Sequence, residues 1–186
     1  MDRKTLQLTV LTRLSLHIDM DESARLARYL IEDLIPLDTA ITEIVEAKID
    51  KATERLIAGK PIQYVTHRAD FYGYQYYVNK AVLIPRPETE ELVYQVLQYL
   101  KKINNRISFD RNLDKRPIPA ILDIGTGSGC IPVTIKKEYN ECNIIAVDIS
   151  NAALKVAIHN ANHHGANVTF FKQDILSEKL TKPSEP

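Results

Sequence analysis

Apolar residues recur at helical intervals through the first sixty positions. One apolar face runs along residues 6–16, a second along 26–34 and a third along 41–56. This spacing predicts three amphipathic helices, whose apolar faces are buried when the helices pack into a small bundle. Gly59 and Pro61 predict the end of the third helix, because glycine accepts a left-handed conformation and proline cannot continue a helix.

Short polar residues mark the expected helix starts. Asp21 or Ser23 is expected to cap the second helix, and Asp38 or Thr39 the third. A side-chain oxygen at such a position accepts one of the amide hydrogens that the first helical turn leaves unpaired.

The pattern changes after residue 63. Residues 70–79 alternate aromatic and β-branched side chains around Gly73, which predicts a β-hairpin. The prolines of segment 83–87 favour an extended chain, and a helix is expected to begin at Thr89. Residues 104–117 are polar and charged, so we expect a surface loop there.

From residue 118 the pattern becomes strand–helix–strand–helix–strand. Apolar strands are expected at 119–125, 143–148 and 167–174, and Ser150 and Gly165 bound the second helix. Continuous apolar strands joined by helices indicate a parallel sheet that is covered on both faces. We therefore predict an α/β fold, with a small N-terminal helical bundle followed by a Rossmann-like parallel sheet.

The composition is balanced, because Lys+Arg and Asp+Glu each number 24 in 186 residues. Zero net charge gives no reason to expect a protein that coats nucleic acid or lies on a membrane. No run approaches the roughly 18 apolar residues of a membrane span, and the N-terminus is a poor signal peptide, so we expect a cytoplasmic protein. Two cysteines, Cys130 and Cys142, predict neither a disulfide framework nor a metal site.

A glycine-rich turn follows the first strand of the expected sheet. It is the segment Asp123-Ile124-Gly125-Thr126-Gly127-Ser128-Gly129, where the strand passes into a helix. Open α/β sheets bind ligands at this end of their strands, and glycines let a ligand approach the backbone. Asp148 ends the second strand at the spacing at which a carboxylate holds a ribose. We therefore expect a nucleotide-like ligand here.

The order of the glycines separates two ligand classes. Dinucleotide enzymes favour G-x-G-x-x-G, but Cys130 occupies the last position and the acidic Asp123 precedes the first glycine. A carboxylate repels a pyrophosphate and attracts S-adenosyl-L-methionine, which is cationic and carries no phosphate. Asp174 and Ile175, at the end of the third strand, are expected to meet the adenine amino group and ring.

Four segments carry a resemblance to a known family. They are GKPIQYVTHRADFYG (59–73), LIPRPETEELV (83–93), ILDIGTGSGCIPV (121–133) and IIAVDIS (144–150). They resemble segments of the PrmC/HemK release-factor glutamine methyltransferases, and the proline-rich segment is the most specific of them. The resemblance implies a class I methyltransferase that uses S-adenosyl-L-methionine to methylate the glutamine of the Gly-Gly-Gln motif in peptide chain release factors.

The resemblance also implies a role for each part of the chain. Residues 1–62 form a helical domain that helps to receive the release factor, 63–117 hold the hairpin, linker helix and loop, and 118–186 form a partial methyltransferase domain. The methionine part of the cofactor is held by Gly125, Thr126, Gly127, Ser128 and Gly129. Asp148 holds the ribose, and Asp174 with Ile175 borders the adenine.

The family's catalytic Asn-Pro-Pro-Tyr motif does not occur in this sequence. Its asparagine and a nearby proline carbonyl align the poorly nucleophilic amide nitrogen, so we expect little or no turnover and assign no catalytic residue. The strand at 119–125 is expected to be a sheet edge with unpaired backbone groups and uncovered apolar faces, which predicts marginal stability, self-association through this edge or a fragment of a longer natural chain.

Two other functions remain open. An amino-methyltransferase of DNA or RNA bases shares the fold and a related motif, although the neutral charge and segment 83–93 count against direct nucleic-acid binding. The other is a non-catalytic fragment that binds the cofactor or a partner.

Overall fold

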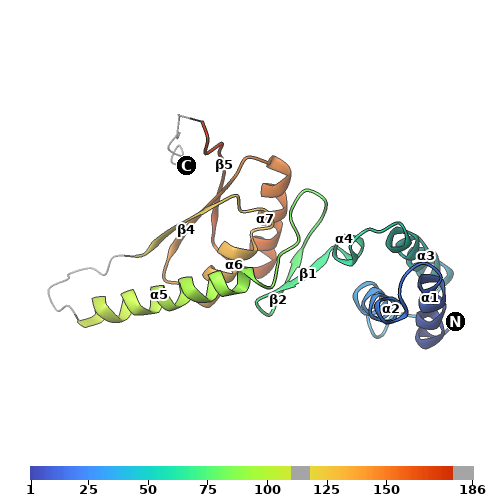
Figure 1. Cartoon of the computed structure of the whole chain (residues 1–186). Coiled ribbons are helices and arrows are strands. Elements are labelled where there is room, and N and C mark those ends of the chain that lie inside the picture. Colours follow the sequence, from blue (N-terminus) through green and yellow to red (C-terminus); the bar gives the residue numbers. More distant parts are fainter. Residues whose placement is uncertain (110–117, 178–186) are drawn as a thin grey trace. The chain divides into compact units, whose positions relative to one another are not determined.

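Figure 1 shows the computed structural model of the protein, which describes residues 1–109 and 118–177. The chain divides into two compact units, Met1–Arg68 and Ala69–Pro186. The functional division into residues 1–62, 63–117 and 118–186 stays a prediction.

The first unit is a bundle of helices, as the spacing of apolar residues predicts. Its elements are α1 (Arg3–Ser15), α2 (Met20–Leu34), α3 (Glu43–Ile57) and the short α4 (Ile62–Thr66). Its buried side chains are mainly aliphatic, and the most deeply buried include Leu6, Val10, Leu14, Leu30, Ile31, Ile35 and Ile49. Removing such side chains from water is the main term that stabilises a small bundle.

Two of these helices are capped by residues other than those that the sequence predicts. Asp19 caps α2, and Thr42 caps α3 by accepting the amide hydrogen of Val45 at 3.4 Å. The predicted caps that the structure contradicts are Asp21, Ser23, Asp38 and Thr39. Several short polar residues compete near each start, and the first turn of an exposed helix carries no apolar signal that would place the boundary.

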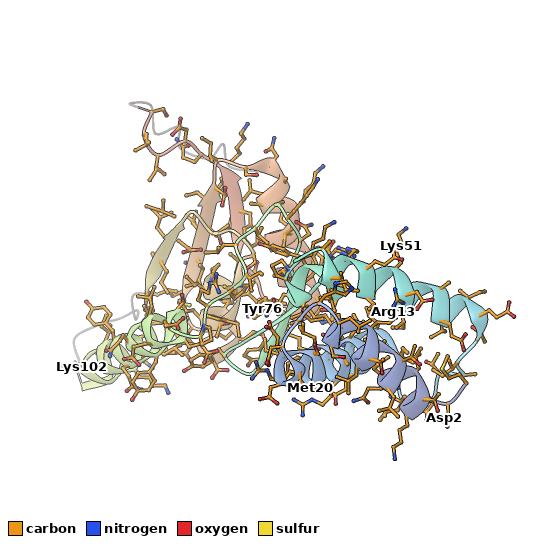
Figure 2. All side chains as sticks on the ribbon, turned by 45° about the vertical axis from the view of Figure 1, so that its right-hand side comes forward. Asp2, Arg13, Met20, Lys51, Tyr76 and Lys102 are labelled. Carbon is orange, nitrogen blue, oxygen red and sulfur yellow. The ribbon has the colours of Figure 1, made fainter. Side chains whose placement is uncertain are left out.

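Polar contacts fix α1 against its two neighbours. The Arg3 guanidinium donates to the carbonyl oxygens of Ile31, Ile35 and Pro36 at 3.2, 2.8 and 3.1 Å, at the C-terminal end of α2. Arg13 of α1, labelled in Figure 2, forms an ion pair of 2.7 Å with a residue of α3, Asp50.

The second unit combines a hairpin, a long helix and a parallel sheet. Its elements are β1 (Arg68–Phe71), β2 (Tyr74–Tyr77), α5 (Thr89–Phe109), β3 (Ala120–Ile124), α6 (Cys130–Glu138), β4 (Asn143–Asp148), α7 (Asn151–His164) and β5 (Thr169–Lys172). The sheet order is β3-β4-β5 and both pairs are parallel, which confirms the predicted alternation of strands and helices. Ser150 caps α7 and Gly165 ends it, as predicted.

Helix α5 is longer than the sequence predicts. It begins at Thr89, as expected, but continues to Phe109 and so includes the first part of the predicted loop 104–117. Residues 110–117 lie outside the described part of the chain. Ile103 and Ile107 follow Leu100 at helical spacing, so the apolar periodicity continues into segment 104–117, where the surrounding polar and charged residues favour a loop prediction.

The predicted hairpin is formed by β1 and β2 (Figure 1). Tyr72 and Gly73 turn the chain with φ angles of 53° and 76°, as a two-residue turn between antiparallel strands requires. Phe71 and Tyr76 are each 1% exposed, and their rings meet edge to face with centroids 6.2 Å apart. Both side chains belong to the same buried cluster as residues of α5, α6 and β4.

The two faces of the parallel sheet differ in exposure. On one face Ile144 and Ala146 are buried, and their strand β4 contacts both α6 and α7. On the other face Leu122, Ile124 and Ile145 are 59%, 51% and 39% exposed. This exposure agrees with the uncovered apolar faces expected at the strand 119–125, whereas the cover of both faces that the apolar strands by themselves indicate is wrong for the described residues. Successive right-handed crossovers toward the same side of a sheet place both connecting helices on one face.

The strand β3 is an edge of the described sheet, as the sequence predicts. Its exposed leucine and isoleucine lie beside backbone groups that no described strand pairs on the outer side. Edges of this kind are templates for pairing with another chain.

We expect the protein to self-associate through β3, and Leu122→Lys to reduce this association. The charge opposes strand addition, while the leucine is too exposed for its loss to destabilise the fold greatly. Size-exclusion chromatography with light scattering measures the mass of each variant. Leu37→Lys is the control, because Leu37 is 86% exposed in the other unit. A wild-type protein that stays monomeric when concentrated contradicts the prediction.

Candidate functional site

The glycine-rich segment forms a compact turn between β3 and α6. The amides of Gly125 and Thr126 both donate to the Val147 carbonyl of β4, at 2.8 and 3.0 Å. The Gly129 amide then donates to the Thr126 carbonyl at 2.9 Å, which closes the turn. The turn is therefore built onto the neighbouring strand, at the carboxyl ends of the parallel strands where ligands of such sheets bind.

Asp148 connects the turn to the next helix. Its Oδ2 accepts the Gly127 amide hydrogen at 2.9 Å, and its Oδ1 accepts the Ser150 amide hydrogen at 2.9 Å. The Ser150 hydroxyl in turn accepts the Ala153 amide hydrogen at 3.2 Å and caps α7. Asp148, which we predict to bind the ribose, thus also has a structural role. Each of its carboxylate oxygens keeps a second lone pair that can accept a hydrogen bond from a hydroxyl group.

Asp123 contributes a second carboxyl group to the same region. Burial raises the pKa of Asp123 and the nearby Asp148 carboxylate raises it further, while the Thr126 hydroxyl counteracts these effects. Asp123 Oδ2 and Thr126 Oγ1 are buried and lack a hydrogen-bond partner that satisfies ordinary geometry. Buried polar atoms without partners are rare in native proteins, so their presence fits a site that receives hydrogen-bond donors or a cation from a ligand.

Gly129 lets α6 approach α7 closely. It has a φ of 76°, and a Cβ atom at this position would lie 3.0 Å from the Ala157 Cβ and 3.1 Å from its Cα. At the other end of the turn, a Cβ atom added to Gly125 would have no atom within 4 Å, so the turn borders open space on that side. One end of the glycine-rich turn is thus packed on a helix, and the other faces outward.

Asp174 and Ile175 follow β5, the strand beside β4. Asp174 Oδ1 accepts the Leu176 amide hydrogen at 3.0 Å, and the Ile175 side chain is 48% exposed. These residues lie at the same end of the sheet as the glycine-rich turn, because the strands are parallel. Their role toward adenine stays a prediction.

Sequence reasoning missed Asn160, whose buried side chain contacts both the turn and the hairpin. Its Nδ2 donates to the Ser128 carbonyl oxygen at 2.9 Å and to the Tyr77 carbonyl oxygen at 2.9 Å. The signal was present in the sequence: Asn160 follows Ala153 by seven residues and Ala157 by three, so it lies on the apolar face of its helix. A polar residue on a buried face needs partners, which periodicity alone does not identify.

The described parts of the chain show few other features of a site. No group of three or more His, Cys, Asp or Glu side chains is arranged there to hold a metal ion. None of the described helices has the length and hydropathy of a membrane span. An open groove lies at the end of α7, lined by Ile158, Gly165 and Phe170 among others, and it does not include the glycine-rich turn.

The comparisons with known proteins agree with this geometry. A family model described as a methyltransferase domain matches residues 121–186. Together with this match, the parallel sheet and its crossover helices have the fold of part of a Rossmann-like class I methyltransferase domain.

Curated relatives give a more particular resemblance. The release factor glutamine methyltransferase of Bacillus subtilis (strain 168) is 44% identical over 118 residues, which are 63% of this chain and 38% of the relative. That of Koribacter versatilis is 40% identical over 137 residues, which are 74% of this chain and 44% of the relative. The resemblance to release factor glutamine methyltransferases is thus confirmed, and the chain spans less than half the length of these relatives.

A solved structure gives a weaker likeness. It is the tRNA (uracil-54, C5)-methyltransferase of Pyrococcus abyssi in complex with S-adenosyl-L-homocysteine, which is 11% identical to this chain. The match has a TM-score of 0.41 and covers 62% of this chain and 25% of the other.

Gly129→Ala is expected to destabilise the protein by about 2–5 kcal/mol. Left-handed backbone strain contributes about 1–2 kcal/mol and the contact with Ala157 about 1–3 kcal/mol. Gly165→Ala is the matched control, because it has a φ of 61° and no atom within 4 Å, so only the strain remains. Urea unfolding followed by circular dichroism measures both. Equal losses in the two variants would show that the approach of α6 to α7 does not require glycine.

Asp123→Asn is expected to raise the melting temperature at neutral pH, and by more as the pH rises. The folded-state pKa of Asp123 lies above its unfolded value. The wild-type protein therefore loses stability as the pH rises from the unfolded pKa, about 3.9, through the folded one, whereas the asparagine variant does not. Melting curves of both proteins between pH 4 and about pH 8 give the difference. A difference that is constant or shrinks with pH contradicts the assignment.

Proposed function

We propose that this chain carries the S-adenosyl-L-methionine-binding part of a protein-glutamine N-methyltransferase that acts on peptide chain release factors. The pair Asp123 and Asp148 at the glycine-rich turn supports this proposal most directly, because two carboxyl groups disfavour a pyrophosphate and favour a cationic ligand. The names of the curated relatives support the same function rather than a base methyltransferase or a module without chemistry.

The residues of the site fit the parts of this cofactor. Asp123 and Thr126 have buried oxygen atoms that make no hydrogen bond of ordinary geometry, and such acceptors suit the ammonium group of a methionine. The open side of Gly125 leaves space beside the backbone, and Asp148 has lone pairs free for the ribose hydroxyl groups. Asp174 and Ile175 would border the adenine. The bound cofactor supplies a methyl group on a positively charged sulfur.

The second substrate is the side-chain amide of the glutamine in the Gly-Gly-Gln motif. An amide nitrogen is a weak nucleophile, so the reaction depends on acceptors that align it with the methyl group. The Asn-Pro-Pro-Tyr motif that would provide them does not occur in this sequence, and we expect this chain alone to bind the cofactor without appreciable turnover. The helical unit would help to receive the release factor, and a protein with this role would act in the cytoplasm, in translation termination.

Calorimetric titration with S-adenosyl-L-homocysteine tests the cofactor site. We expect wild-type protein to bind, and Asp148→Asn to weaken binding about tenfold or more, because one charged acceptor is lost. Since Asp148 also holds the turn and α7, a control must disturb this region without touching the ligand. Ser150→Ala is such a control: it removes the cap of α7 and costs about 1 kcal/mol of stability, yet leaves the carboxylate in place.

Three results are informative. Loss of binding in Asp148→Asn together with retention in Ser150→Ala supports direct contact with the ribose. Equal loss in both variants means that Asp148 acts only through the fold. A folded wild-type protein that does not bind the ligand contradicts the proposed function of this chain.

A further inference from the structure

Asn160 of α7 holds two distant segments of the second unit in one hydrogen-bonded arrangement. Its side chain is 1% exposed. Its Oδ1 accepts the Tyr77 amide hydrogen at 2.8 Å, and its Nδ2 donates to the carbonyl oxygens of Tyr77 and Ser128, both at 2.9 Å. Because the oxygen faces a donor and the nitrogen faces two acceptors, only one orientation of the amide satisfies these three contacts.

The two segments are the end of the hairpin and the glycine-rich turn. Tyr77 is the last residue of β2, and Ser128 lies between the two glycines that lead into α6. The Ser128 carbonyl group lies two peptide groups after the Gly127 amide, which donates to Asp148 Oδ2 at 2.9 Å. Two side chains therefore bond to the backbone of this short turn: Asp148, which we assign to the ribose, and Asn160, which also bonds to the hairpin.

Other hydrogen bonds of the hairpin do not involve the glycine-rich turn. The Tyr76 hydroxyl and Thr134 Oγ1 of α6 share a buried hydrogen bond of 2.7 Å, and the Tyr74 hydroxyl donates to Glu138 at 2.7 Å. Among the hydrogen bonds of the described residues, those of Asn160 connect the hairpin directly to the glycine-rich turn. Removal of the Asn160 side chain is therefore expected to affect the glycine-rich turn, whereas removal of another hairpin contact is not.

We propose that Asn160 is a positioning residue that makes the conformation of the glycine-rich turn, and hence cofactor affinity, depend on the docked hairpin. The part of this proposal that concerns cofactor affinity rests on the proposed cofactor site. Residues 78–82 connect the hairpin to segment 83–87, so an event that displaces the hairpin would change the cofactor site through one side chain.

Two substitutions of Asn160 and one control test the proposal in the full chain. Asn160→Asp keeps the size and the acceptor but faces two carbonyl oxygens with a carboxylate, and Asn160→Ala removes all three bonds. Thr134→Val is the matched control, because it removes one buried hydrogen bond of the hairpin without reaching the turn. If Asn160→Ala does not fold, Asn160→Asp remains as the variant of the same size.

The first measurement is the affinity for S-adenosyl-L-homocysteine by calorimetry, well below the melting temperature of each variant. We expect the dissociation constant to rise about tenfold or more in both Asn160 variants, and to stay within about twofold of wild type in Thr134→Val. Wild-type affinity in the Asn160 variants, or an equal loss in Thr134→Val, overturns the proposal.

The second measurement is amide hydrogen exchange without ligand, which separates this proposal from the proposed function. We expect peptides that cover residues 125–129 to exchange faster in the Asn160 variants, while Thr134→Val accelerates only the hairpin peptides. If wild-type protein fails to bind the ligand, the proposed function fails, and faster exchange at the turn still supports the positioning role. Unchanged exchange at the turn overturns it.

Discussion

The site depends on the two hydrogen bonds that the Asp148 carboxylate accepts from backbone amides. One of these amides, that of Gly127, belongs to the glycine-rich turn, and the other, that of Ser150, belongs to the start of α7. A carboxylate that accepts backbone amides forms charge-assisted bonds, which are stronger than neutral ones. The same carboxylate is thus a fold element and the expected ligand for a ribose, so substitution of Asp148 alone does not separate the two roles.

The second carboxyl group gives the site its chemical character. Asp123 lies where burial and Asp148 both disfavour its ionised form, so the folded protein holds an unfavourable arrangement of charge in the absence of a cation. Such local destabilisation is common where a protein binds or transforms a ligand. A positively charged ligand at the proposed site would relieve this repulsion between residues at the ends of β3 and β4.

Local signals in the sequence predict much of this structure. Ser150 and Gly165 bound α7 as expected, because a cap and a left-handed residue act within one helical turn. The sequence predicts the wrong cap for α2, because Asp19, Asp21 and Ser23 are all suitable capping residues. The exposed face at β3 is expected for an edge strand without its covering elements, and the position of both helices on the other face follows from the hand of the crossovers. Asn160 was missed because its partners are 83 and 32 residues away in sequence.

That separation in sequence also bears on the order in which the protein folds. A two-stranded hairpin is only marginally stable by itself in water. Most of the strand–helix–strand contacts of the sheet join elements that are neighbours in the chain, whereas the bonds between β2 and α7 close a loop of 83 residues. Contacts between distant segments require the larger loss of chain entropy and form slowly. The hairpin is therefore expected to acquire its final geometry late, after α7 has formed against the sheet.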